Sequence, residues 1–192
     1  MSQDDVVNLF KESGALLTGH FKLTSGRHSD VYYEKFTLLK QPALCTRLCA
    51  RMADTLRTTG VRTIVGPTTG GIILAYDVAR YLGVEAIYAE AADDGKGRVF
   101  KRGFHLEPGQ KVAIVDDVLT TGTSVDEVIA LVRRYGAEIV GLRLMLDRSN
   151  GKVRFDYPFA ALATVAAESW DPAECPLCAK AMPLTQRGSR KF

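Results

Sequence analysis

One stretch decides the fold of this 192-residue chain: Lys111-Val112-Ala113-Ile114-Val115-Asp116-Asp117-Val118-Leu119-Thr120-Thr121-Gly122-Thr123-Ser124. Its first five residues form an apolar, β-branched run with the length of a buried central strand. Apolar residues recur at helical spacing over 125–134, and Gly136 supplies a stop. The pattern predicts a strand that ends before the acidic pair, then a hydroxyl-rich turn and a helix.

Each part of this stretch has a chemical use. Small residues let backbone N–H groups close around a phosphate, and the start of a helix adds a favourable field. Hydroxyl groups can donate to phosphate oxygens, whereas the carboxylates of Asp116 and Asp117 would repel them. We therefore expect the acids to face ribose hydroxyls or a hydrated magnesium ion on the ligand. The alternative is an ordinary acidic turn with an N-capping Thr or Ser.

The complete pattern resembles the phosphoribosyl-diphosphate (PRPP) motif of the type I phosphoribosyltransferases. It is not a P-loop, because no Gly-Lys-Ser or Gly-Lys-Thr is present. The resemblance implies that one run binds PRPP: Asp116, Asp117, Val118, Leu119, Thr120, Thr121, Gly122, Thr123 and Ser124.

The composition is that of an ordinary globular protein, with 46% hydrophobic and 24% charged residues. A net charge of +3 is too small to indicate nucleic-acid binding, and no apolar run approaches the length of a membrane span. The polar, acidic start is unlike a secretory signal. We therefore expect a cytoplasmic protein with reduced cysteines and without nucleic-acid or membrane partners.

Residues 19–33 combine strand-like alternation at Phe21 and Leu23 with a turn at Ser25-Gly26. A solvated hairpin is the plain interpretation. The segment also resembles the orotate phosphoribosyltransferases, whose pattern is Phe-x-Leu-x-Ser-Gly-x-x-Ser followed by aromatic residues. Several of those enzymes carry Lys where this chain has Thr24, and Lys22 lies on the same face of the predicted strand.

A second small-residue loop, 66–71, lies between a predicted strand over 63–65 and a predicted helix over 72–82. It is another candidate anion cradle, or else a turn without a ligand. The resemblance implies that Thr69 and Gly70 bind PRPP at its pyrophosphate. Many orotate enzymes carry Lys at the place of Gly70, so here backbone amides must serve or a cation must come from elsewhere.

Residues 90–105 follow a predicted strand over 85–89 and lack a sustained apolar period. Such a long connection indicates a functional or mobile loop. Its position resembles the catalytic lid of the orotate enzymes, although Ala91 stands where relatives often have a basic residue. The resemblance implies a homodimer whose lids reach the neighbouring site. It also names three candidate catalytic cations: Lys96, Lys101 and Arg102.

Arg148 follows a predicted strand over 138–146. A planar guanidinium suits a carboxylate next to a ring carbonyl. The resemblance implies that Arg148 and Thr120 bind orotate, whereas an ordinary strand-end arginine is the alternative.

The four cysteines form two spaced pairs. Cys45 and Cys49 lie beside the apolar stripe of a predicted helix over 44–56, and we expect them to pack in the core. Cys175 and Cys178 form a Cys-x-x-Cys pair, which raises redox and zinc interpretations. A lone pair is incomplete for a closed zinc site, so we expect these cysteines to pack the tail unless the fold brings the other pair to them.

Alternating strands and helices predict an α/β domain with a mainly parallel central sheet flanked by helices. The resemblance implies a type I phosphoribosyltransferase-like fold in one domain over 1–192. We expect a core of about 40–148 and a small hood of about 1–35 and 149–185. The N-terminal residues 5–17 predict a helix interrupted near Gly14, and 159–165 predict a last strand.

The resemblance implies an orotate phosphoribosyltransferase, which joins orotate to the phosphoribosyl group of PRPP. Mg²⁺ is expected to be bound mainly through PRPP or pyrophosphate, with no direct protein ligand. Two alternatives remain: a phosphoribosyltransferase for another base, and a regulator that binds PRPP without catalysis.

Overall fold

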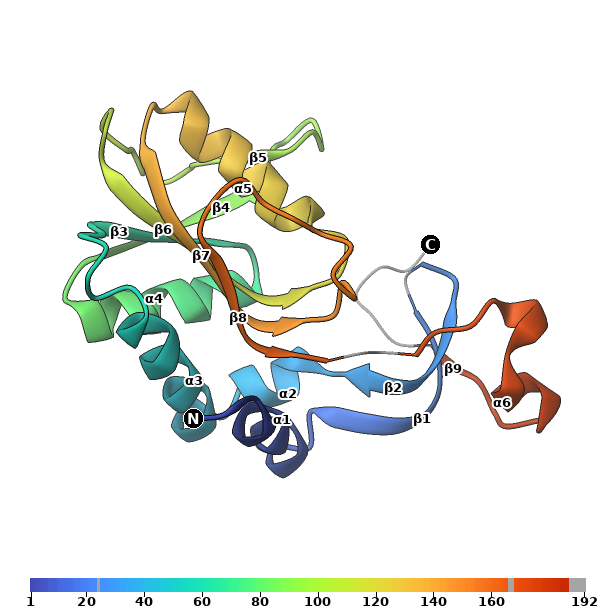
Figure 1. Ribbon diagram of the computed structural model, residues 1–192. Helices are drawn as coiled ribbons and strands as arrows, with labels where there is room; N and C mark the ends of the chain where they lie inside the picture. The colour runs from blue at the N-terminus through green and yellow to red at the C-terminus, as the bar shows by residue number, and fades with distance from the viewer. Residues whose placement is uncertain (24, 166–167, 187–192) are drawn as a thin grey trace.

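A six-stranded sheet forms the centre of the computed structural model, which describes residues 1–23, 25–165 and 168–186. The strand order is β5-β4-β3-β6-β7-β8 (Figure 1). Neighbouring strands are parallel, except that β5 pairs antiparallel with β4 at one edge. The strand bounds are β3 (Thr63–Pro67), β4 (Glu85–Ala91), β5 (Arg98–Val99), β6 (Lys111–Leu119), β7 (Glu138–Asp147) and β8 (Phe159–Thr164).

Helices cover both faces of this sheet (Figure 1). Four pack on one face: α1 (Gln3–Glu12), α2 (Lys35–Leu39), α3 (Pro42–Asp54) and α4 (Gly70–Leu82). The opposite face is covered by α5 (Thr123–Arg134). Alternate residues of β6 serve the two layers, since Ala113 and Val115 face the first cluster while Val112 and Ile114 face the second. Burial on both faces explains why this strand reads as a continuous apolar run.

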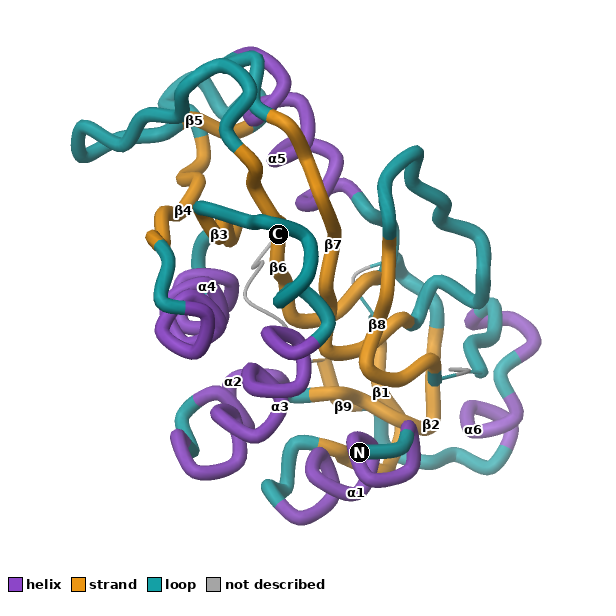
Figure 2. Tube along the Cα trace, turned by 60° about the vertical axis from the view of Figure 1, so that its left-hand side comes forward, coloured by secondary structure: helices purple, strands orange, loops and turns teal. Residues whose placement is uncertain are grey.

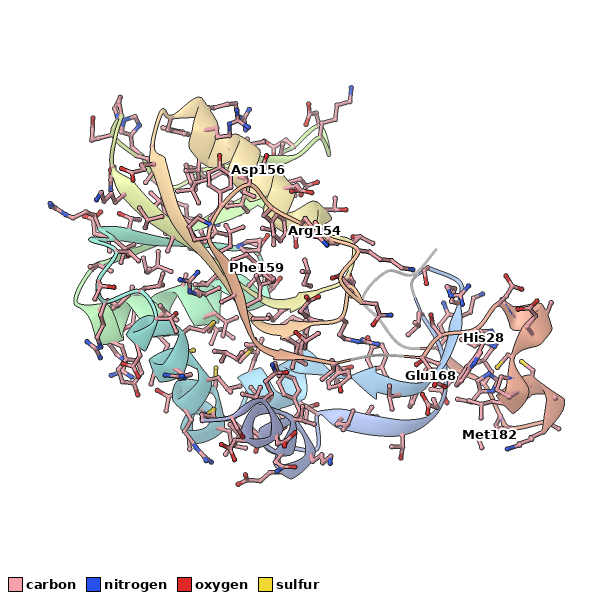
Figure 3. All side chains as sticks on the ribbon, viewed as in Figure 1. His28, Arg154, Asp156, Phe159, Glu168 and Met182 are labelled. Atoms are coloured by element: carbon pink, nitrogen blue, oxygen red, sulfur yellow. The ribbon has the colours of Figure 1, made fainter. Side chains whose placement is uncertain are left out.

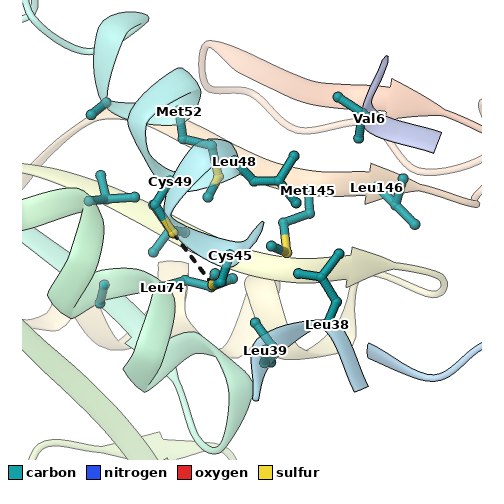
Figure 4. Packing of buried hydrophobic residues seen from close by; sticks show 14 of the residues in the cluster. Val6, Leu38, Leu39, Cys45, Leu48, Cys49, Met52, Leu74, Met145 and Leu146 are labelled. Carbon is teal, nitrogen blue, oxygen red and sulfur yellow. Dashed lines mark hydrogen bonds between the residues drawn. The ribbon is translucent and has the colours of Figure 1, made fainter. Parts of the chain in front are cut away.

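Cys45 and Cys49 lie in the core, as the helical spacing predicted. Both are nearly inaccessible, and their sulfur atoms are 3.9 Å apart. Figure 4 shows them among Leu48, Met52 and Leu74. The hydrogen bond with Cys45 and burial raise the pKa of Cys49, whereas the same hydrogen bond lowers the pKa of Cys45. Both buried side chains fill space in the core.

The chain reverses its direction of travel across the sheet at β3. After β3 it adds β4 on one side, and then returns to place β6 on the other side of β3. The helix that follows β3 covers one face, whereas the helix that follows β6 covers the other. Open α/β sheets bind ligands beside the carboxyl ends of the strands at such a switch point.

A smaller sheet forms a hood beside the main body (Figures 1 and 2). It consists of β1 (Leu16–Lys22), antiparallel β2 (His28–Tyr33) and β9 (Thr185–Gln186), which is parallel to β1. The tail also contains the short helices η1 (Pro172–Glu174) and α6 (Pro176–Ala179). Thr24, the position discussed above for a missing lysine, lies outside the described residues.

Several predicted boundaries are wrong. The first helix ends at Glu12 rather than continuing toward Leu17, because Gly14 takes a φ of 72° and β1 begins at Leu16. The strand predicted over 111–115 continues through the acidic pair to Leu119, because Val118 and Leu119 still pair with β7. Short elements at 35–39, 98–99 and 185–186 were not predicted at all.

The predicted division into core and hood is also wrong in two places. The strand β8 was assigned to the hood but pairs with β7 in the main sheet. Helix α1 likewise buries Val6, Leu9 and Phe10 in the main core. The apolar face of each element must be covered, and the main sheet offers the larger apolar surface. In the described part of the chain, no helix combines the length and the apolarity that crossing a membrane requires.

Candidate functional site at the carboxyl ends of β3, β6 and β7

The gap between two central strands creates the site. The pairing of β3 with β6 ends at Val65 and Ile114, whereas β6 and β7 stay paired up to Leu119 and Asp147. Beyond Ile114 the chain after β3 and the end of β6 therefore separate. Two loops flank this gap, and we call 66–71 the glycine loop and 120–124 the hydroxyl loop.

Asp116 and Asp117 lie inside the end of β6 and so point to opposite faces of the sheet. Asp116 is 6% exposed and accepts hydrogen bonds from Ser124 Oγ and from the Asp117 backbone, both at 2.8 Å. Burial and the adjacent Asp117 raise the pKa of Asp116 to about 7, although those hydrogen bonds oppose the shift. Asp116 is thereby tied to the hydroxyl loop.

Asp117 instead faces the glycine loop and the start of α2. Lys35 Nζ lies 2.9 Å from both of its carboxylate oxygens. Burial lowers the pKa of Lys35, but the charge and hydrogen bond of Asp117 outweigh it, so the net shift is upward. Sequence reasoning missed Lys35, and no local spacing indicates a partner 82 positions away.

The absence of a side chain at Gly70 has a steric reason. A Cβ built there would lie 2.1 Å from Asp117 Oδ2. No residue other than glycine fits while the carboxylate holds this position. Gly70 is the position at which this chain lacks the lysine discussed above. Lys35, on another element, places a cation close by through its ion pair with Asp117.

The glycine loop is shaped by close backbone contacts. A Cβ on Gly66 would lie 2.0 Å from the Gly71 carbonyl oxygen, and one on Gly71 would lie 2.6 Å from the Pro67 ring. The peptide bond between Thr68 and Thr69 is cis. Thr69 is exposed at the start of α4 and makes no capping hydrogen bond, so the first N–H groups of this 13-residue helix face the gap without a side-chain cap.

The hydroxyl loop is open by comparison. Thr120, Thr121 and Thr123 are exposed, and the last two hydroxyls are 3.1 Å apart. Gly122 takes a φ of 84° as the N-cap of α5, again without a side-chain cap. The N-terminus of this helix and the three hydroxyls form a suitable surface for a phosphate.

The side chains of three predicted members of the PRPP run make contacts within the protein. The side chains of Val118 and Leu119 pack into the two apolar clusters. The Ser124 hydroxyl donates to Asp116, so that proton is not directed at a ligand. A single strand-end pattern cannot separate these residues from the exposed threonines, because their difference depends on which side chains the sheet buries.

Arg148 joins the site from the end of β7. Its backbone N–H donates to the Leu119 carbonyl at 2.9 Å, next to Thr120, and its guanidinium lies 4.9 Å from the centre of the Tyr33 ring. Nε is buried without a hydrogen-bond partner among the described residues, and burial lowers the pKa of the group. A buried guanidinium with an unused donor is suited to an anionic ligand.

The predicted lid, residues 90–105, contains a short strand and two aromatic contacts that its composition did not indicate. Its C-terminal part is held by Phe100 against Tyr135 and by Phe104 against Tyr88, with ring centres 5.3 Å and 5.1 Å apart. Residues 92–97 project between β4 and β5 (Figures 1 and 2). The short strand β5 and these two aromatic contacts divide 90–105, so the part without such contacts is mainly 92–97.

The lid cations differ in their partners. Lys101 pairs with Asp93 at 2.5 Å and Arg102 with Glu90 at 3.3 Å. The Lys96 ammonium is exposed and makes no ion pair with a described residue. Within one chain, the structure does not bring any of the three to the acidic pair.

A separate hollow of about 910 Å³ lies at the opposite end of the sheet. Arg62, Val84 and Lys111 line it, at the amino ends of β3, β4 and β6. It contains none of the predicted site residues, and parallel sheets of this kind bind ligands at the other end. We therefore assign the site to the gap and not to this hollow.

The chain is similar to known proteins over its whole length. Residues 37–176 match the family described as "Phosphoribosyl transferase domain". The orotate phosphoribosyltransferase of Desulforamulus reducens is 43% identical over 192 residues, covering 100% of both chains. That of Carboxydothermus hydrogenoformans is 45% identical over 189 residues, covering 97% of this chain and 98% of the relative. The crystal structure of orotate phosphoribosyltransferase from Aeropyrum pernix matches with a TM-score of 0.72 and 27% identity, covering 83% of this chain and 93% of that one.

Proposed function

The chain belongs to the phosphoribosyl transferase family and, within it, to the orotate phosphoribosyltransferases, and from this premise we propose how its site works. The enzyme transfers the 5-phosphoribosyl group from PRPP to orotate, giving orotidine 5′-monophosphate and pyrophosphate in pyrimidine biosynthesis. The expected type I phosphoribosyltransferase fold is confirmed by the same similarities and by the mainly parallel sheet.

One observation supports this assignment of the site most directly. The Nε of Arg148 is buried at the end of β7 and has no hydrogen-bond partner in the described part of the chain, and the Arg148 backbone is bonded to Leu119, beside the hydroxyl loop. An anionic base held by Arg148 and Thr120 would therefore lie next to a sugar phosphate held by the same loop. Charge-assisted, bidentate contacts to the orotate carboxylate and an adjacent ring carbonyl suit a guanidinium.

PRPP would span the gap between the two loops. The exposed hydroxyls of the hydroxyl loop and the start of α5 bind its 5-phosphate. The backbone of the glycine loop and the start of α4 bind its pyrophosphate. Asp116 and Asp117, whose oxygens only accept when ionised, face the ribose hydroxyls between them.

The reaction forms a bond between an orotate ring nitrogen and ribose C1 while the bond from C1 to the pyrophosphate oxygen breaks. Pyrophosphate leaves with the electron pair, and C1 passes through an oxocarbenium-like state as in glycoside cleavage. The attacking ring nitrogen gives up its proton to water or to the leaving pyrophosphate as the new bond forms, so the protein needs no strong base. Catalysis then comes from holding the two substrates together and from cations near the leaving group. Lys96, Lys101 and Arg102 are the candidates for this role.

Mg²⁺ fits the donor set at the gap only as an ion carried by the substrate. Asp116 is bonded to Ser124 and a backbone N–H, and Asp117 is paired with Lys35, so neither carboxylate is free to be a dedicated ligand. Mg²⁺ commonly keeps several waters and binds through substrate phosphates. When bound, it would neutralise charge on the pyrophosphate, and the carboxylates would contact its water molecules.

We assign the activity to a homodimer in the cytoplasm. The four cysteines are free, which suits a reducing compartment. Residues 92–97 project from their own subunit, and the lid cations do not reach their own acidic pair, which supports action across a dimer interface.

Subunit mixing tests the shared site. One inactive protein carries Lys101→Ala and Arg102→Ala, and the other carries Asp116→Asn and Asp117→Asn. A mixed dimer has one site in which an intact motif meets an intact lid from the partner, so activity should reappear. With subunit exchange demonstrated by native mass spectrometry, a mixture that stays inactive would reject action in trans.

A spectrophotometric assay of orotate consumption with PRPP and Mg²⁺ tests the function itself. Turnover should occur with orotate and not with uracil, adenine or hypoxanthine. Turnover with one of the other bases instead would identify a phosphoribosyltransferase of different specificity. Tight PRPP binding without any turnover would identify a regulator.

A further inference from the structure

Four side chains outside the substrate site converge at the junction of the hood and the tail. His20 on β1 and His28 on β2 meet Cys175 and Cys178, which flank the start of α6. Their potential ligand atoms all lie within 4.8 Å of one another. Figure 3 shows His28 on the hood facing the tail, with Met182 nearby. We call these four residues the tail cluster.

We propose that the tail cluster is a structural Zn²⁺ site that fastens the tail to the hood. Two imidazoles and two thiolates form a complete ligand set for tetrahedral zinc. The Cys-x-x-Cys pair, incomplete in the sequence, is thus completed by two histidines and not by Cys45 and Cys49. The expectation that Cys175 and Cys178 only pack the tail is replaced by this proposal.

Four of the six distances between ligand atoms are close to those of a tetrahedron around zinc, and all six are within 4.8 Å. Bond lengths of about 2.0 Å to nitrogen and 2.3 Å to sulfur place tetrahedral neighbours about 3.3 Å apart for two nitrogens and about 3.6 Å for nitrogen and sulfur. The two ring nitrogens, His20 Nε2 and His28 Nδ1, are 3.0 Å apart. The nitrogen–sulfur distances are 3.5 Å and 3.7 Å from His20 Nε2 and 3.3 Å from His28 Nδ1.

The orientation of His20 supports the same conclusion. Its Nδ1 lies 2.9 Å from the Met182 carbonyl oxygen, which can only accept a hydrogen bond. Nδ1 therefore carries the hydrogen, which leaves Nε2 as the nitrogen that can offer a lone pair to a metal in the cluster. Histidine ligands of zinc are commonly oriented in this way by a second hydrogen bond to a carbonyl.

Hydrogen bonds alone satisfy this arrangement poorly. His20 Nε2 has one lone pair but three neighbours: His28 Nδ1 and both thiols. If His28 Nδ1 donates a hydrogen bond to His20 Nε2, the single lone pair of Nε2 is used. Neither of these two nitrogens can then accept a hydrogen bond from a thiol. Three of the four residues are buried, where unpaired polar atoms are costly, and a cation at the centre satisfies all four at once.

A site here would have a clear structural effect. Among the described residues, the other contacts between tail and hood include the bridge between His28 and Trp170 and the hydrogen bond of His20 with the Met182 carbonyl. Ser29 and Arg27 also contact residues 168–169, and the two-residue strand β9 pairs with β1. His20 and Cys175 are 155 positions apart, so a metal bridge closes a long loop of chain. The same hood leads through Tyr33 and Lys35 to the substrate site.

Zinc content and affinity test the proposal in the full-length protein. We expect one zinc per chain by elemental mass spectrometry, and a dissociation constant at least about 100-fold higher for Cys178→Ala, measured against a chromophoric chelator. Cys178 is exposed, so this change leaves the fold intact. Cys45→Ala removes a buried thiol elsewhere, and His105→Gln removes the exposed histidine; both controls should keep the metal.

Two spectroscopic and thermal readouts complete the test. Co²⁺ added to the metal-free protein should give the intense visible bands of tetrahedral coordination and a thiolate charge-transfer band, both lost in Cys178→Ala and in His28→Gln. A zinc-selective chelator with Mg²⁺ in excess should lower the Tm by about 5–10 °C in the unchanged protein and little in Cys178→Ala. Reconstituted protein with less than about 0.1 zinc per chain, or a disulfide between Cys175 and Cys178 that zinc and reductant leave unchanged, would overturn the assignment.

Discussion

The glycine loop and the hydroxyl loop have the same outline, a strand followed by small residues and a helix, but they are built by different means. In the glycine loop the backbone leaves no room for a side chain at three buried glycines, which lie against Pro67, Asp117 or one another. In the hydroxyl loop three threonines point to solvent, and only Gly122 is required by the backbone. The glycine loop therefore offers mainly backbone N–H groups and the exposed Thr69, whereas the hydroxyl loop presents three exposed hydroxyls.

At an anion site, the path of the backbone and the polar groups that line it can therefore vary independently. Each loop also lies against one of the paired acids. Asp117 lies beside Gly70 of the glycine loop, and Asp116 accepts a hydrogen bond from Ser124 of the hydroxyl loop. We expect substitutions in the glycine loop to act first on stability, and substitutions in the hydroxyl loop to act on ligand binding. The predictions below test this contrast.

The largest effect is expected for Gly66→Ala. The new Cβ would lie 2.0 Å from the Gly71 carbonyl oxygen, and backbone on both sides cannot yield cheaply. The free energy of unfolding should fall by at least about 3 kcal/mol in urea titrations. Gly83→Ala is the control, because that residue has a φ of 68° with open space around it, so only about 1 kcal/mol should be lost. Equal losses in the two variants would show that the glycine loop is not tightly built.

Arg148→Ala should act on the base and not on the fold. The orotate carboxylate loses its charge-assisted partner, which corresponds to about 2–4 kcal/mol of binding. Orotate binding at saturating PRPP, measured by calorimetry, should weaken while the KM for PRPP changes little. Arg143→Lys is a useful comparison, since Arg143 lies within β7, the strand that Arg148 follows, but bonds Thr55 and Pro158 away from the gap. Unchanged orotate affinity in Arg148→Ala would remove that residue from the site.

Asp117→Asn tests the link between the acids and the glycine loop. The change removes the charge that holds Lys35, so kcat/KM for PRPP should fall about 30-fold, or about 2 kcal/mol. Lys35→Met should produce much of the same loss, and the double variant should lose less than the sum, because the two groups form one pair. If the double variant loses as much as the two single variants together, Asp117 and Lys35 act independently and do not form a functional pair.

The pH dependence of stability isolates Asp116. Its pKa is about 7 in the folded protein and near 3.8 in the unfolded chain, so the folded state binds the extra proton between these values. The contribution of Asp116 to the free energy of unfolding is full below the pKa of the unfolded chain and is lost as the pH rises through about 7. The free energy of unfolding should therefore fall by about 1 kcal/mol between pH 6 and pH 8. Asp116→Asn cannot titrate, so the difference between the two proteins should show this slope in urea unfolding. A difference that does not vary with pH would contradict the raised pKa.

The smallest effect is expected for Thr123→Val in the hydroxyl loop. The residue is exposed, so the free energy of unfolding should change by less than about 0.5 kcal/mol. Loss of one hydroxyl donor should raise the KM for PRPP about 5- to 10-fold. Steady-state kinetics and urea unfolding of the same preparation check both values. A large loss of stability with unchanged KM would reverse the proposed contrast between the loops.

Much of the architecture could be predicted because its signals are local. The alternation of apolar runs with helical stripes placed β3, α4, β6, α5 and β7 close to their observed positions. The acidic pair and the two small-residue loops could be recognised for the same reason. Boundaries failed where tertiary contacts outweighed local chemistry, as at Val118 and Leu119, which extend β6 because β7 continues beside them.

Long-range pairings could not be predicted from any one segment. Lys35 meets Asp117 across 82 positions, and Arg148 meets Tyr33 only because the hood lies over the end of β7. The histidines of the hood and the cysteines of the tail are separated by about 150 positions, so neither pair is informative alone. The cost of closing such loops depends on the whole fold and leaves no mark in the local pattern.

The sequence by itself determined the α/β alternation, the two loops and the residue types that suit a sugar phosphate, because periodicity and local composition act over a few residues. The tertiary structure alone decided which face of β6 each acid serves, that a side chain at Gly70 would meet Asp117, and that four residues of the hood and tail surround one point. These facts arise where the sheet brings distant segments within a few ångströms of one another, and distance in space is what hydrogen bonds, ion pairs and metal ligands require.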